Sequence, residues 1–201
     1  TPVNAPTPEP EPTAAAEPEA TQKPAAEPTE GGSSAAQAED RPTLKTPILM
    51  TSAGQSADVQ MFSTIAKKSG VESTARELVE ADSLAAGEYQ TLVVVVGGSS
   101  KGLGAAGIDA DQELQRVNAV VEKLKDSCTI VVAHIGGDAR RGELSDRFIN
   151  AVVPAADYLI VVESGNQDGL FTQLAEQHAI PMDTCQNIAQ VGELFAQAIA
   201  A

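Results

Sequence analysis

The sequence is poor in basic residues, histidine and cysteine, and each shortage argues against a class of function. It has 13 Lys and Arg against 28 Asp and Glu, which gives a formal net charge of −15. So acidic a chain argues against nucleic acid as a partner, because phosphates repel negative charge. The two histidines, His134 and His178, lie far apart without any Cys/His spacing. We therefore predict no metal site, and no motif predicts a cofactor.

The sequence contains only two cysteines and no long apolar run. Cys128 precedes one predicted strand and Cys185 follows another. We expect them at opposite ends of a sheet, as two separate thiols packed like small apolar side chains. No apolar run approaches the length of a membrane span, and the chain starts at Thr1 without a signal-like segment. We expect membrane attachment only through a tether outside this sequence, and the sequence identifies no membrane-protein partner.

Residues 1–46 form a region of distinct composition. They contain nine of the twelve prolines, no aromatic residue, and eight acidic against three basic residues. Such a segment buries too little apolar surface to offset its loss of entropy on ordering, so we predict a disordered, extended linker. Acidic Ala/Pro/Glu/Thr spacers are common in bacterial proteins anchored outside the membrane by a lipidated cysteine. We expect an extracytoplasmic location; a linker to another domain, with a cytoplasmic location, stays an alternative.

Residues 47–201 alternate between strand and helix patterns, which is typical of a three-layer α/β domain. We predict one domain with an open, mostly parallel, Rossmann- or flavodoxin-like sheet of strand order 2-1-3-4-5. The predicted strands are 48–51, 73–79, 92–96, 129–133 and 158–162, with a further short strand at 180–184.

The central feature of this domain is the stretch from Thr91 to Asp109. The continuous Leu/Val run 92–96 is typical of a strand that is buried on both faces. A loop with five glycines follows it. A helix is expected after Asp109, with Gln112 as the capping-box partner.

Loops rich in glycine, serine and charge follow the carboxyl ends of the predicted strands. In open parallel sheets these ends share one edge, and ligands bind where the strand order reverses, here between the first and third strands. We therefore predict a site for a small, polar and anionic ligand at this edge, held by backbone N–H groups, the first helix and basic side chains. The predicted ligand-binding residues are Ser52, Gln55, Ser56, Gly97, Gly98, Ser99, Ser100, Lys101, Gly102, Gly104, Arg140, Arg141 and Glu163.

Three familiar motifs do not fit. The sequence Gly102-Leu-Gly-Ala-Ala-Gly107 matches the glycine turn of short-chain dehydrogenases, but neither tyrosine has the lysine four residues later that their catalysis needs. A Walker A loop is absent, because no Gly-Lys-Ser/Thr occurs. A G-x-S-x-G nucleophile elbow is absent as well, so the serines are better explained as caps and hydrogen-bond donors.

Two alternatives to ligand binding stay open. The first is a hydrolase or transferase in which His134 acts with Glu143 or Asp138 as acid and base. The second is a structural or partner-docking module. The sequence leans toward binding rather than catalysis, because no catalytic motif is complete.

Four sequence segments together resemble one family: TSAGQSADVQM, VVVVGGSSKGLGAAGID, HIGGDARRGELSDRFI and YLIVVESGNQDGLF. They are similar to an uncharacterised family of bacterial domains of unknown function, often exported or lipid-anchored. The resemblance covers nearly all of residues 47–201. It implies a Rossmann-like α/β fold and an extracytoplasmic setting, and it implies no activity.

Overall fold

The computed structural model describes residues 41–199, which contain a six-stranded, fully parallel sheet of order β2-β1-β3-β4-β5-β6. The predicted α/β class and the order 2-1-3-4-5 are confirmed, and β6 extends the sheet beyond β5. The strands are β1 (Ile48–Ala53), β2 (Thr74–Ala75), β3 (Thr91–Val96), β4 (Thr129–His134), β5 (Tyr158–Val162) and β6 (Met182–Cys185).

Within residues 41–199, six α-helices connect the strands and follow the last one. They are α1 (Asp58–Lys68), α2 (Ser100–Ala106), α3 (Ala110–Leu124), α4 (Glu143–Val152), α5 (Leu170–His178) and α6 (Ile188–Ala198). Short 3-10 turns include η3 (Asp138–Arg140), after β4, and η5 (Glu163–Asn166), after β5. The predicted capping box of α3 is confirmed, since the Asp109 side chain accepts from the Gln112 N–H and the Gln112 side chain accepts from the Asp109 N–H.

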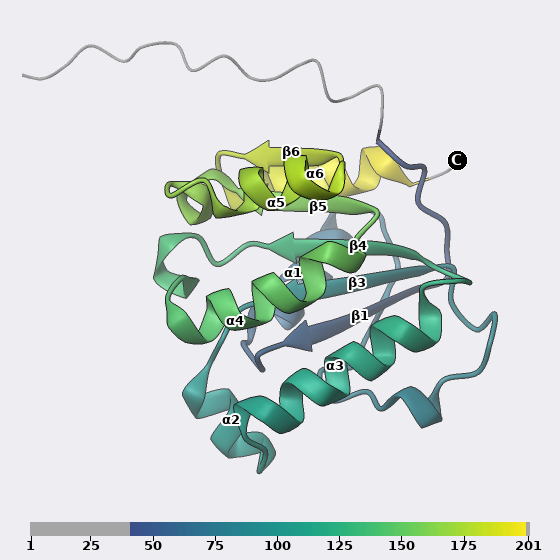
Figure 1. The fold of residues 1–201 in the computed structure, drawn as a ribbon. Coiled ribbons are helices and arrows are strands. Elements are labelled where there is room, and N and C mark those ends of the chain that lie inside the picture. The colour runs from purple at the N-terminus through teal and green to yellow at the C-terminus, as the bar shows by residue number, and fades with distance from the viewer. Residues whose placement is uncertain (1–40, 200–201) are drawn as a thin grey trace, which may run out of the picture. The chain divides into compact units, whose positions relative to one another are not determined.

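The helices cover both faces of the sheet, as Figure 1 shows. On one face, α3, α4 and α5 pack on the sheet through buried residues such as Val117, Phe148 and Phe171. On the other face, α1 and α6 pack through Phe62 and Phe195, whose ring centroids are 5.0 Å apart. Because both faces are covered, β3 is apolar from Leu92 to Val96 and every one of its residues is buried.

Two local predictions need correction. The strand predicted at 73–79 is reduced to the two residues of β2, because only Thr74 and Ala75 pair with β1. The glycine-rich stretch predicted as a loop contains helix α2. Its N-cap Ser99 accepts a hydrogen bond from Gly102 N–H, and Gly107 ends the helix with a positive φ of 71°. Serine capping and a terminal glycine therefore make a short helix where glycine content alone suggested a loop.

Residues 41–46, which we expected in the linker, contact the domain. Leu44 is fully buried and its N–H donates to the carbonyl of Ala198 at 2.7 Å. Arg41 forms an ion pair with Asp183 of β6 at 2.7 Å. The rest of the predicted linker, residues 1–40, lies outside the described residues.

Both cysteines are free and buried, as predicted. Cys128 lies just before β4 and Cys185 ends β6, so they sit toward opposite ends of the sheet. Burial raises the pKa of both thiols, that of Cys185 to about 11, which keeps them protonated and unreactive at neutral pH.

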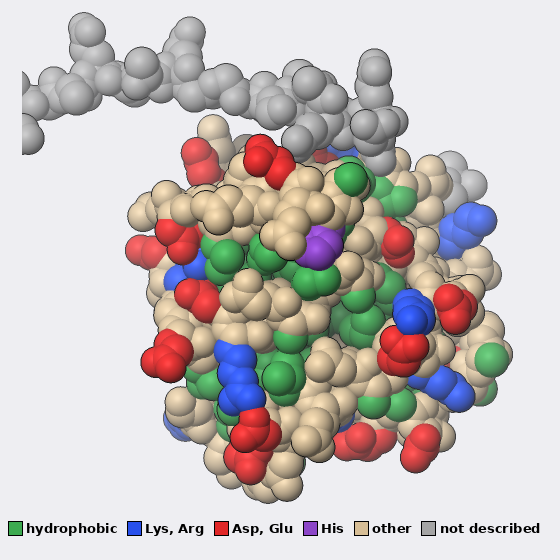
Figure 2. Space-filling view, viewed as in Figure 1, with side chains coloured by type: hydrophobic (Ala, Val, Ile, Leu, Met, Phe, Trp, Pro, Cys, Tyr) green, Lys and Arg blue, Asp and Glu red, His purple; other side chains and the backbone are tan. Residues whose placement is uncertain are grey.

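The surface carries charges of both signs, and apolar side chains lie between the helices on the face in Figure 2. Within residues 41–199, no helix combines the length and the apolar character that crossing a bilayer requires.

Candidate functional site

The loops after β1 and β3 meet at the carboxyl edge of the sheet, as the strand order predicts. They are joined along their backbones: Gly97 N–H donates to Ala53 O at 3.0 Å, and Ser99 N–H donates to Gly54 O at 2.8 Å. Gln55 and Gly98 form an antiparallel bridge. The reversal of strand order therefore brings the predicted residues together, but the chain itself fills the space between them.

The glycines of this region permit close packing of chain on chain. A Cβ atom at Gly102 would lie 1.9 Å from Gln55 O, and one at Gly54 would lie 2.6 Å from Gly97 O. The N–H of Gly98 donates to Ser145 Oγ, and that of Gly102 donates to Ser99 Oγ. The backbone N–H groups of Gly97, Gly98 and Gly102, which we expected to hold a ligand, are thus paired within the protein.

A buried ion pair fixes the loop after β1. Glu113 and Arg116 of α3 are both buried, with Arg116 Nε 2.7 Å from Glu113 Oε2. Glu113 Oε1 accepts from Gly54 N–H and from Gln55 Nε2, each at 3.0 Å. The Arg116 guanidinium donates to the carbonyls of Ser52 and Val79. Since these buried charges are paired and hydrogen-bonded, they position the loop instead of awaiting a ligand.

Asp58 differs from these groups because one of its carboxylate oxygens has no hydrogen-bond partner within residues 41–199. It occupies the first position of α1, is 4% exposed, and none of residues 41–199 gives its Oδ2 a hydrogen-bond partner. A Cβ atom at Gly97 would lie 3.1 Å from this oxygen, and one at Gly136 would lie 2.7 Å from it. The carboxylate therefore lies where the loops after β1, β3 and β4 converge. A buried, unsatisfied carboxylate oxygen is costly and needs an explanation.

Arg140 is the basic side chain beside this carboxylate. Its Nε lies 3.6 Å from Asp58 Oδ1, which is an ion pair beyond hydrogen-bond distance. The Arg140 side chain is 39% exposed, and its Cβ and Cγ pack against Gly136 so closely that a Cβ there would lie 2.5 and 2.0 Å from them. Arg140 thus covers Asp58 while part of it faces solvent.

Arg141 was predicted together with Arg140, but its guanidinium is already paired with groups of the protein. It donates to Asp146 at 2.8 Å, to both carboxylate oxygens of Asp168, and to the Gly165 carbonyl. Its guanidinium lies 5.7 Å from the ring centroid of Phe171. This pairing lowers the pKa of Asp168 to about 2 and raises that of Arg141. Arg141 therefore joins the loops after β4 and β5, which leaves Arg140 as the arginine with a free face.

His134, the candidate acid–base residue, is fully buried at the end of β4. Its Nδ1 is 3.1 Å from Val96 O and its Nε2 is 3.0 Å from Gly137 O, so both ring nitrogens contact carbonyl oxygens. The ring packs on Phe171 with centroids 5.2 Å apart. Burial lowers the pKa of His134, so the ring is neutral at pH 7. The geometry favours a structural role over proton transfer to a substrate.

The remaining predicted residues divide by exposure. Ser52, Gln55 and Ser56 are buried beneath the joined loops, and no group in 41–199 pairs with Ser52 Oγ. The exposed residues are Ser100, Lys101 and Gly104 of α2, Glu143, which begins α4, and Glu163, which begins η5. No three His, Cys, Asp or Glu side chains among the described residues are grouped to bind a metal ion.

The sequence interpretation missed Asp58, Glu113 and Arg116. An acidic residue in the first turn of a helix usually compensates the helix dipole, so Asp58 gave no signal of its own. Glu113 did carry one, because it shares the buried face of α3 with Val117, Val120 and Leu124 at spacings of four, three and four residues. A charge within an apolar stripe is the pattern that could have revealed the pair.

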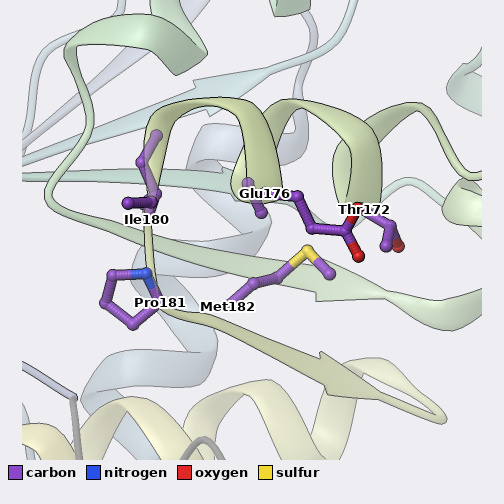
Figure 3. A pocket seen from close by; sticks show the side chains of 7 residues that line it. Thr172, Glu176, Ile180, Pro181 and Met182 are labelled. Carbon is purple, nitrogen blue, oxygen red and sulfur yellow. The ribbon is translucent and has the colours of Figure 1, made fainter.

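Two cavities are relevant. A groove of about 490 Å³ lies at the carboxyl edge, between the loops after β4 and β5 and the start of α6, and Gly136 is among its lining residues. A second cavity of about 520 Å³ lies between α5 and β6. Figure 3 shows Thr172 and Glu176 of α5 above Met182 of β6 in this second cavity. Asp138, one of the acid–base candidates, lines the groove, but none of the predicted ligand-binding residues lines either cavity.

The fold and the loops define an open α/β domain in which the Asp58–Arg140 pair combines a buried, unpaired carboxylate oxygen with a part-exposed guanidinium. The chain belongs to the family described as domain of unknown function DUF6305, whose model matches residues 45–199. No curated protein matches the sequence. Among solved structures, the chain is similar to the regulatory domain of the master biofilm regulator CsgD, at 9% identity and a TM-score of 0.33. The match covers 72% of this chain and 97% of that one.

Proposed function

We propose that this domain binds a small polar molecule at the carboxyl edge of the sheet, between Asp58 and Arg140. The observation that carries the proposal is the buried Oδ2 of Asp58, which finds no partner among residues 41–199. A ligand that donates a hydrogen bond to this oxygen would remove the cost of leaving it unsatisfied. The ligand would therefore carry a hydroxyl or amine group.

Arg140 adds a second requirement to the ligand. Its guanidinium is held only loosely, at 3.6 Å from Asp58 Oδ1, and 39% of its side chain is exposed. A carboxylate could bind the exposed edge of the guanidinium through two parallel hydrogen bonds. Entry to Asp58 requires the Arg140 side chain to move off Gly136, so Arg140 would both admit the ligand and pair with it. The ligand class is thus a small acid that carries a hydroxyl or amine group, which retains the anionic character expected from the sequence.

This site differs in its donors from the one that the sequence suggested. The backbone N–H groups of Gly97, Gly98 and Gly102 are already paired, and Arg141 is held by two aspartates. The geometry also favours binding over acid–base chemistry, because both nitrogens of His134 contact carbonyl oxygens.

A thermal-shift screen of the full chain against hydroxy acids, amino acids and plain carboxylates tests the proposal. A ligand that binds only the native state raises the unfolding midpoint. We expect hydroxy or amino acids to raise it more than the matched plain carboxylates do. The shift should be lost in Asp58→Asn and Arg140→Gln, and kept in the controls Asp111→Asn and Arg147→Gln, which alter an exposed pair. Ligand shifts of normal size in both site variants would contradict the proposal, as would an absence of shifts across the panel, which would favour partner docking.

We also propose that the domain works outside the cytoplasm, anchored by a lipid tether. The proline-rich, acidic composition of residues 1–46 supports this, since it is typical of an extended spacer. Protease treatment of intact cells, followed by immunodetection, tests the location. Digestion in whole cells or in spheroplasts, with a cytoplasmic marker left intact, is the expected result; protection until lysis would contradict it.

A further inference from the structure

The groove at the carboxyl edge adjoins the Asp58–Arg140 site through a shared residue. Gly136 lines the groove, and a Cβ atom there would lie 2.0 Å from Arg140 Cγ and 2.7 Å from Asp58 Oδ2. The groove has a volume of about 490 Å³, within the range of small-molecule sites. A molecule held by Asp58 and Arg140 could therefore extend past Gly136 into it.

The lining of the groove suits an apolar group. Ile135 and Val162 belong to the sheet–helix core on this face, and Ile188 packs against the same core. Ala189 adds a methyl group at the exposed rim.

Two polar side chains around the groove already have hydrogen-bond partners. Asn187 caps α6, and its Oδ1 accepts from the N–H groups of Ala189 and Gln190 at 3.0 and 3.2 Å. The Asp138 carboxylate accepts from Ala139 N–H at 2.8 Å. No Lys or Arg lines the groove, and Asn187 caps the start of α6, so the groove offers no cationic side chain to an anion. Contact with an apolar group is what it can still provide.

We infer that the ligand is an amino acid with an apolar side chain. This inference rests on the proposed function. The ammonium group donates to Asp58 Oδ2, the carboxylate pairs with the exposed edge of Arg140, and the side chain passes Gly136 into the groove. An ammonium group satisfies the buried carboxylate better than a hydroxyl does, because a charge-assisted hydrogen bond is stronger.

Calorimetry on the full chain with glycine, alanine, 2-aminobutyrate, norvaline and leucine tests the inference. Each methylene that enters the groove should tighten binding about fourfold, which corresponds to about 0.8 kcal/mol. Leucine should bind at least tenfold more tightly than isoamylamine, which lacks the carboxylate, and than 4-methylpentanoate, which lacks the amine.

One variant separates the groove from the polar site. Ala189→Trp fills the groove from its exposed rim and should abolish the dependence on side-chain length while glycine and alanine still bind. Gln197→Trp is the matched control, since Gln197 is an exposed residue near the other end of α6. It should leave the series unchanged.

The outcomes distinguish the inference from the proposed function. Affinities that do not depend on side-chain length, or a length dependence that survives Ala189→Trp, would overturn the inference. If Asp58→Asn still abolished binding in that case, the proposed function would stand. If only hydroxy acids bound, and their binding depended on Asp58, the inference of an amino acid ligand would be wrong and the proposed Asp58–Arg140 site would stand.

Discussion

Glu113 and Arg116 form a two-point ion pair in the interior of the protein, with Arg116 Nε 2.7 Å from Oε2 and its Nη2 2.9 Å from Oε1. The pair satisfies backbone groups of the loop after β1 as well as its own charges. Through Gly54 it holds the start of the segment that leads to α1 and Asp58.

Removing one member of this pair should destabilise the protein strongly. Glu113→Gln leaves the Arg116 charge buried without its partner, and such a loss costs about 3–5 kcal/mol in the free energy of unfolding. Urea denaturation measures it. Glu122→Gln, which removes an exposed partner of Lys125 on the same helix, is the control and should change stability by less than about 0.5 kcal/mol. A loss below about 1 kcal/mol for Glu113→Gln would contradict the structural role of the pair.

Two glycines of α2 test whether the glycine-rich stretch serves to pack α2 closely against the loop after β1. Gly102→Ala places a Cβ 1.9 Å from the Gln55 carbonyl, so the joined loops must separate, at a cost of about 1–3 kcal/mol. Gly104→Ala has open space around the new methyl group and should stabilise the same helix by about 0.5–1 kcal/mol. Chemical denaturation of both variants measures the contrast, and effects of the same sign would refute the packing explanation.

His134 should make the fold sensitive to acid. Burial holds its pKa in the folded state below the ordinary value of 6.5, and the weaker effects of the contacts with Gly137 and Val96 oppose this. The unfolded chain therefore takes up a proton first as the pH falls. The stability that neutral His134 contributes is complete above about pH 6.5 and is lost as the pH falls toward the folded pKa.

Urea midpoints at pH 7.5 and pH 5.0 test this, with His134→Asn as the variant. Wild type should lose more stability across this interval than the variant, although the variant is less stable at pH 7.5. Two neighbouring charges also act on the pKa of His134: Arg141 lowers it and Asp58 raises it. The His178→Asn variant, altered at an exposed histidine of α5, should follow the wild-type curve. Parallel curves for wild type and His134→Asn would contradict the prediction.

The compact domain should begin near residue 41 rather than at residue 47. Deletion of residues 1–40 should leave the free energy of unfolding within about 0.5 kcal/mol of the full chain, as expected for a linker. Deletion of residues 1–46 removes the buried Leu44 and the Arg41–Asp183 ion pair, and should cost at least about 2 kcal/mol. Thermal unfolding of the two truncated chains compares them, and equal midpoints would place the boundary at residue 47.

The strand and helix patterns of the sequence were enough to predict the three layers and the loops that share one edge, and the commonest order of such sheets supplied the strand order. Continuous apolar strands such as 92–96 and the stripe of α3 are local patterns with a fixed period, and short crossovers allow few topologies. The capping box at Asp109 could be predicted for the same reason, since it needs only residues three apart.

Which loop residues are available to a ligand could not be predicted without the packed fold. Whether Gly102 faces a ligand or the Gln55 carbonyl, and whether Arg140 or Arg141 is occupied, depends on contacts between segments far apart in the chain. Asp58 became a candidate for the same reason: its Oδ2 lies beside loops that follow three different strands and finds no partner among residues 41–199. Composition and spacing describe which groups are present, whereas hydrogen-bond satisfaction is a property of the packed fold.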